Sequence, residues 1–86
     1  MSQFAYKFRN FGIRPDMMEA IKRYVDDHEP RGDFLRAVIC NNLKDACGLA
    51  DDDNLQNLPA FVAYFYNIAP SACWGSPEKY QAWITP

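Results

Sequence analysis

The sequence predicts an all-α fold, a small bundle of about four helices preceded by a short extended N-terminal arm. Three observations lead to this prediction. Apolar residues recur at steps of three and four along most of the chain, Pro and Gly interrupt this pattern where helices would end, and alternation with a period of two is confined to the first residues. A chain of 86 residues has room for one domain. We therefore assign residues 1–13 to the arm and residues 14–86 to the bundle.

The N-terminal arm contains the stretch FAYKF. Phe4, Tyr6 and Phe8 alternate with small or basic residues, which is typical of a strand. Because one strand cannot form a sheet, we expect the arm to pack on the helices or to pair with a second copy.

The first helix is expected at about residues 15–27. Pro15 suits the first helical position, and Asp16 places a negative charge in the first turn. Pro30 and Gly32 then end the helical pattern.

The second helix is expected at about residues 34–47. Asp33 is a favourable N-cap, and Gly48 is a favourable residue to close the helix. Apolar residues recur between them at helical spacing.

A third helix is expected at about residues 52–67. Pro59 lies inside this run and either bends one long helix or begins a shorter one, and we favour one helix bent near Pro59. The last helix is expected from Ser76, its cap, to about Ile84.

Composition and charge narrow the function classes. The net charge of −2 argues against a protein that binds mainly nucleic-acid phosphates. The basic first third still leaves a DNA-binding accessory protein as a weaker alternative. No apolar run is long enough for a membrane span, and the N-terminus lacks the apolar stretch of a signal peptide. Three cysteines without tight pairs fit reduced thiols, so we expect a cytoplasmic protein.

Potential chemistry centres on the cysteines and the single histidine. Cys40, Cys47, Cys73 and His28 could supply four zinc ligands, but a spacing of seven separates the first two by about 10 Å along a helix. A nucleophilic pair of Cys73 and His28 lacks a third member in the sequence. We therefore expect no metal, no cofactor and no enzymatic activity.

The turn SACWG and the asparagines allow two interpretations. Gly75 and Ser76 are explained by a turn and a cap, and Trp74 can fold back on the third helix. The asparagines near apolar faces are Asn41, Asn42, Asn54, Asn57 and Asn67, and such residues usually cap helices or form turns. Alternatively, Tyr66, Asn67 and Trp74 would surround a polar cavity for a small nucleotide-like ligand.

The stretches GDFLRAVICNNL, ADDDN and YFYNIAPSACWGSPEKYQAWI, in this order, resemble a group of small uncharacterised proteins of bacteriophages, prophages and plasmids. The resemblance spans residues 13–84, and it implies no particular activity for this chain. It implies expression in a bacterial cytosol from accessory genes that modify the host.

In that context we expect stoichiometric binding to a bacterial host protein, as in inhibitors of host defence systems such as anti-CRISPR proteins. The aromatic content of 15% exceeds what a small core needs, which also allows a homo-oligomer. The expected contact residues are Phe4, Tyr6, Phe8, Arg9, Arg31 and Trp74.

Overall fold

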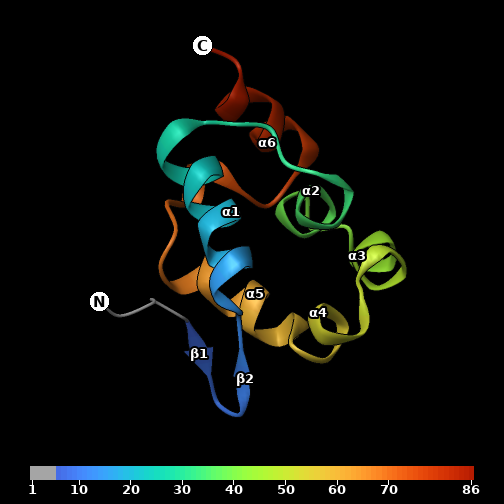
Figure 1. Ribbon diagram of the computed structural model, residues 1–86. Coiled ribbons are helices and arrows are strands. Elements are labelled where there is room, and N and C mark those ends of the chain that lie inside the picture. The colour runs from blue at the N-terminus through green and yellow to red at the C-terminus, as the bar shows by residue number, and fades with distance from the viewer. Residues whose placement is uncertain (1–5) are drawn as a thin grey trace.

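The computed structural model describes residues 6–86, so Phe4 of the expected arm lies outside the described residues. The described part is mostly helical, as predicted, with a small hairpin at its N-terminal end (Figure 1). The expected count of about four helices is wrong, because two of the expected helices are each divided in two. The elements are β1 (Lys7–Phe8), β2 (Phe11–Gly12), α1 (Pro15–Asp27), α2 (Asp33–Ile39), α3 (Leu43–Leu49), α4 (Asp52–Gln56), α5 (Leu58–Asn67), a 3-10 turn (Ser71–Cys73) and α6 (Pro77–Ile84).

The expected single extended arm is instead a β-hairpin. β1 and β2 pair antiparallel, with Lys7 opposite Gly12 and Phe8 opposite Phe11. Arg9 in the turn has a φ of 56°, a left-handed conformation that Gly, Asn or Asp usually supplies in tight hairpins. The sequence lacked that turn signal at Arg9, which is why the pairing was not predicted.

The second expected helix ends at Ile39 because two consecutive asparagines redirect the chain. Asn41 is left-handed, with a φ of 62°, and the amide of Asn42 donates to the carbonyl of Ala37 at 2.8 Å, as in a Schellman ending. The side chain of Asn42 then caps α3 by accepting from the amide of Asp45. Gly48 consequently lies within α3 and does not close it.

The third expected helix is divided at Asn57, so the alternative in which Pro59 begins a shorter helix is correct. Pro59 lies in the first turn of α5, where its missing N–H removes no intrahelical hydrogen bond. Asp51 caps α4 by accepting from the amide of Asn54 at 2.8 Å.

The predicted first and last helices agree with α1 and α6. The hydroxyl of Ser76 accepts from the amide of Lys79 at 3.1 Å, which confirms the predicted cap. α6 docks on the end of α1, because the indole N–H of Trp83 donates to the carbonyl of Tyr24 at 2.9 Å and His28 stacks on the Trp83 ring.

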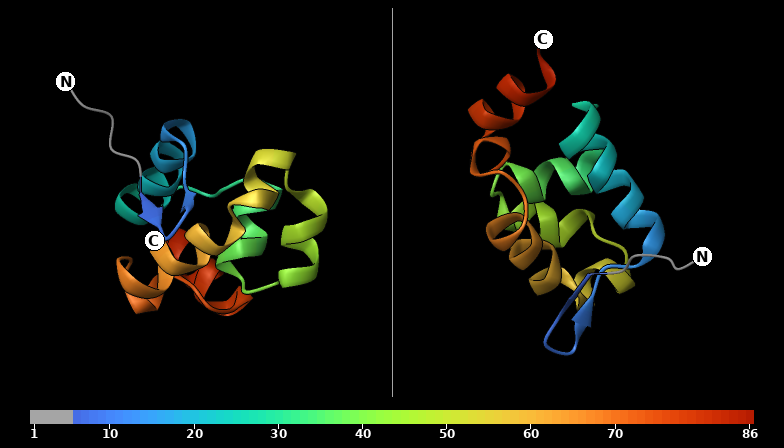
Figure 2. Two further views of the ribbon diagram at one scale, coloured as in Figure 1. Left: turned by 90° about the horizontal axis from the view of Figure 1, so that it is seen from below. Right: turned by 90° about the vertical axis from the view of Figure 1, so that its left-hand side faces the viewer.

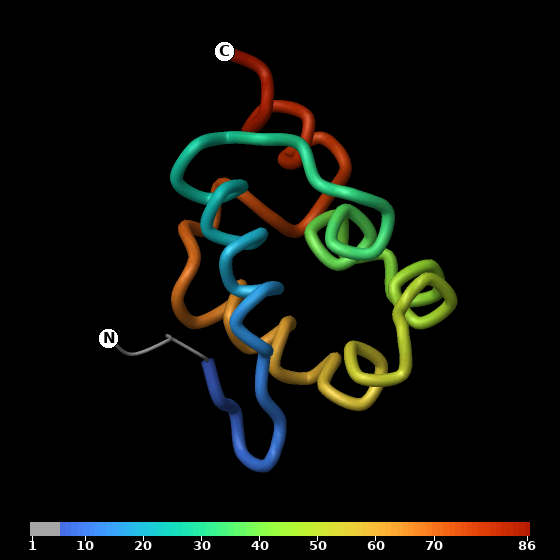
Figure 3. The backbone as a smooth tube through the Cα atoms, in the orientation of Figure 1, coloured from blue at the N-terminus to red at the C-terminus, as the bar shows by residue number. Residues whose placement is uncertain are grey.

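The core lies between the helices, and α5 contributes buried residues to the core along most of the length of the helix. Two views show that the hairpin and α6 lie at opposite ends of the molecule (Figure 1 and Figure 2). The tube through the backbone shows α2 and α3 end-on, at the side of the molecule away from the N-terminus (Figure 3). Within residues 6–86, the largest fully buried side chains are Ile13, Met18, Ile21, Tyr24, Ile39, Phe61, Phe65 and Cys73.

Candidate functional site

The main candidate site is an open apolar groove along α5. It has a volume of about 450 Å³ and combines three segments that are distant in sequence: β1, α3 and α5. Among residues 6–86, no Asp or Glu lines it. The lining residues are Phe8, Leu43, Leu58, Pro59, Val62, Ala63, Tyr66 and Asn67; we call this site the α5 groove.

Large apolar side chains of the α5 groove are exposed. Tyr66 has 76% of its surface exposed, Leu43 67% and Val62 44%. Pro59, Val62 and Tyr66 follow one another at steps of three and four, which places them on one face of α5. Phe61 and Phe65 are buried on the other side of the same helix. α5 is therefore apolar on both sides, and only one side is covered by the core.

One cation lies against the lining of the α5 groove, and a second follows a lining residue in the sequence. The guanidinium of Arg9 lies 5.3 Å from the centre of the Phe8 ring, and within residues 6–86 it makes no ion pair. Lys44 directly follows Leu43, and its side chain is 94% exposed, with Asp45 at 3.9 Å. A pair this exposed and this long holds the ammonium weakly. Arg9 is thus available to a negatively charged partner at the groove, and Asp45 offsets the charge of Lys44 only weakly.

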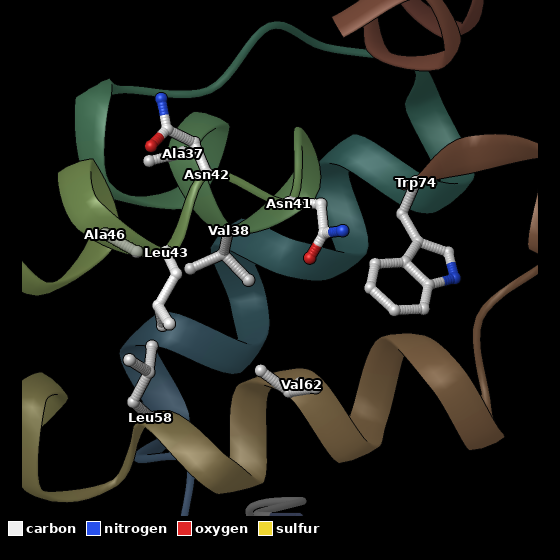
Figure 4. A pocket seen from close by; sticks show the side chains of 9 residues that line it. All are labelled: Ala37, Val38, Asn41, Asn42, Leu43, Ala46, Leu58, Val62 and Trp74. Atoms are coloured by element: carbon white, nitrogen blue, oxygen red, sulfur yellow. The ribbon is translucent and has the colours of Figure 1, made fainter. Parts of the chain in front are cut away.

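Trp74 lies beside the α5 groove, over a separate small cavity. Asn41 and Trp74 face each other above α5 (Figure 4). The cavity shares Leu43, Leu58 and Val62 with the groove, but its volume is about 30 Å³. That is room for about one water molecule, whereas ligand pockets are on the order of 300 Å³ or larger.

The structure divides the residues that the sequence suggested for binding. Phe8, Arg9, Tyr66 and Asn67 meet at the α5 groove. Tyr6 packs inward, edge-to-face on the ring of Tyr64 at 5.4 Å. It therefore contributes to packing rather than to an open surface.

Arg31 lies away from the groove, in the segment between α1 and α2. Its guanidinium donates to the carbonyl of Pro30 and pairs with Glu29 at 3.2 Å. Its backbone N–H donates to the hydroxyl of Tyr80 at 3.1 Å. These contacts connect the loop to α6.

The sequence interpretation missed Leu43, Pro59 and Val62 as groove residues. Leu43 and Val62 continue the apolar spacing of the second and third expected helices, which is typical of core residues. Once the break at Asn41 and Asn42 is taken into account, Leu43 begins a new helix and is no longer in phase with α2.

Cys73, the thiol that the sequence offered as a nucleophile, lies in the core. Cys73 has no exposed surface, and burial raises the pKa of its thiol to about 11. A reactive thiol needs the opposite shift. His28 is engaged by Trp83, whose backbone carbonyl accepts from Nδ1 at 2.7 Å. Among residues 6–86, no three His, Cys, Asp or Glu side chains gather as metal ligands would.

Most of the asparagines have local structural roles. Asn41 and Asn42 connect α2 to α3, and Asn57 holds the hairpin, because its Oδ1 accepts from the amide of Gly12 at 2.9 Å. Asn54 is buried, and its Oδ1 has no hydrogen-bond partner in the described part of the chain. Asn67 is exposed at the end of the α5 groove.

Comparisons of the chain with protein-family models, with curated proteins and with solved structures found no match. None of the helices in residues 6–86 has both the length and the apolar character needed to cross a membrane. The groove geometry is therefore the main guide to function.

Proposed function

We propose that this chain is an accessory protein of a phage or mobile element that binds a bacterial host protein stoichiometrically through the α5 groove. One observation carries the proposal: Leu43, Val62 and Tyr66 expose much of their apolar surface on one face. Burying such a face against a partner removes apolar surface from water. Contiguous exposed apolar surface of this kind is typical of interaction sites.

The lining of the groove favours a protein partner over the other ligand classes. Among the described residues, the polar side-chain groups in the lining are the amide of Asn67 and the hydroxyl of Tyr66, which are adjacent in sequence, whereas a nucleotide needs several converging polar groups. Nucleic acid would need many cations to neutralise its phosphates, but the net charge is −2 and, among the described residues, no Lys or Arg lines the groove.

Co-purification from a bacterial host tests the proposal. We expect the wild-type protein to retain a host protein at a fixed ratio, measured by light scattering after size-exclusion chromatography. Val62→Asp should abolish this, because it buries an unpaired charge in the interface. Leu49→Asp is the matched control, because Leu49, like Val62, is a half-exposed aliphatic residue on a helix surface, at 50%, but lies outside the groove.

Equal retention by Val62→Asp and Leu49→Asp would overturn the proposal, and so would a wild-type protein that retains no partner. The host context rests on the resemblance to phage and plasmid proteins. Inhibition of a host defence system, such as CRISPR, is the finer form of the proposal. Restored plaque formation on an immune host, lost with Val62→Asp, would support it.

A further inference from the structure

We infer that the α5 groove takes an amphipathic helix of its partner, with an apolar face against α5 and carboxylates on its flanks. This inference rests on the proposed function and names the chemistry of the partner. It follows from the shape of the groove and from the charges at its rim.

The exposed face of α5 in the groove is about two helical turns long. The exposed face of α5 from Pro59 to Tyr66 extends about 10 Å along the helix axis, and Figure 1 shows α5 between the hairpin and α3. Phe8 of the hairpin and Leu43 of α3 complete the lining. A helix laid along α5 presents apolar residues at i, i+3, i+4 and i+7, which is how short amphipathic helices fill apolar grooves.

The rim charges select a partner with carboxylates. Arg9 stands over Phe8 of the lining at 5.3 Å. Lys44 follows Leu43 in the sequence, and its pair with Asp45 is long and exposed. Neither cation is strongly paired within the described residues. Acidic side chains on an incoming helix would meet them, while basic side chains would be repelled.

The same charges argue against a second copy of this chain as the occupant. A two-fold interface places one surface against its own copy. The α5 groove would then bring Arg9 and Lys44 against the same cations of the second molecule. Among the described residues the lining contains no Asp or Glu, and Asp45 offsets Lys44 only through a long, exposed pair, so like charges would face each other at the rim.

A matched pair of synthetic peptides tests the inference. Both are capped helices of about four turns with leucines at i, i+3, i+4 and i+7; one carries glutamates beside the leucines and the other carries lysines at those positions. Binding to the full-length protein is followed by amide chemical shifts. We expect the glutamate peptide to bind about tenfold more tightly at low salt, with a smaller preference at high salt, and to shift Val62 and Tyr66.

Variants assign the preference to the rim. The double variant Arg9→Glu with Lys44→Glu should reverse the preference. The double variant Lys22→Glu with Lys79→Glu makes the same change in charge on α1 and α6, which contribute no residue to the groove, and should retain it. Val62→Asp should abolish the binding of both peptides.

Three results would overturn the inference: binding of neither peptide, equal binding of both, or binding that Val62→Asp leaves intact. The proposed function fails separately. Suppose that the wild-type protein retains a host protein, that Val62→Asp loses it, and that Arg9→Glu with Lys44→Glu does not change its binding. The groove is then an interaction site, and only the inference of an acidic helix is wrong.

Discussion

The backbone N–H of Gly12 donates a hydrogen bond to Oδ1 of Asn57 at 2.9 Å, across 45 positions of sequence. Nδ2 of the same Asn57 side chain donates to the backbone carbonyl of Asp53 at 2.8 Å. One side chain therefore fastens the hairpin to the corner between α4 and α5. This fastening holds the hairpin, and with it Phe8, beside the α5 groove.

Replacing Asn57 should loosen this corner. We expect Asn57→Ala to lower the free energy of unfolding by about 1–3 kcal/mol, because it leaves the half-buried Gly12 N–H without its acceptor. Chemical denaturation measures the change. Asn67→Ala removes an exposed asparagine of the same size and should stay within about 0.5 kcal/mol of wild type. Equal effects of the two substitutions would refute the role of Asn57.

Stability should fall in acid through Asp51. The pKa of Asp51 is lowered, first by the hydrogen bond from the amide of Asn54 and then by Arg14, whose Nη2 lies 3.1 Å away. A carboxyl with a lowered pKa in the folded state contributes stability above its unfolded pKa, near 4, and loses it as the pH falls through the folded value.

Asp51→Asn should therefore lose less stability than wild type between pH 6 and pH 2, as measured by denaturation at each pH. Asp52→Asn is the control, because within residues 6–86 Asp52 makes no ion pair. If both variants follow the wild-type acid profile, Asp51 does not contribute to it.

Asn54 offers a stabilising substitution. Asn54 is only 5% exposed, and its Oδ1 has no hydrogen-bond partner among the described residues. An unpaired buried carbonyl is costly, and an apolar side chain of similar volume removes that cost. We expect Asn54→Leu to leave the free energy of unfolding unchanged or raise it by about 1 kcal/mol. A loss larger than this would reveal a polar contact at that atom.

The three thiols should react in a fixed order with an aromatic disulfide reagent. Cys47 is exposed and should react first. Cys40 is half-buried, and burial raises the pKa of its thiol, so it should follow. Cys73 should react only on unfolding, since it is buried and its pKa is raised to about 11. Mass spectrometry of the labelled peptides gives the order, and rapid labelling of Cys73 in the native protein would contradict the core placement.

Local signals explain why some elements could be predicted from the sequence. Pro15 and the pair Ser76 and Pro77 mark helix starts by rules that depend on neighbouring residues alone, and α1 and α6 agree with the predictions. The breaks at Asn41 and Asn57 were missed for another reason. The residues on either side of these asparagines continue the apolar spacing, so the sequence shows no break. At Asn41 the helix ends through a left-handed backbone. At Asn57 the side chain accepts a hydrogen bond from Gly12, which is distant in sequence.

The candidate site was harder to predict than the helices. Tyr66, Asn67, Phe8 and Arg9 were singled out for their side chains, and they do meet at the groove. Val62 could not be separated from the core, because a helix that is apolar on both sides has no polar face to show which side is buried. The exposed side depends on where the hairpin and α3 pack, which is a property of tertiary structure.

Because β1, α3 and α5 each supply part of the groove, this surface is a conformational epitope. A peptide that copies α5 alone would lack Phe8 and Leu43 and would compete poorly for the partner. An antibody raised against the folded protein could block the groove, whereas one raised against a linear segment would bind only one of the three segments that line it.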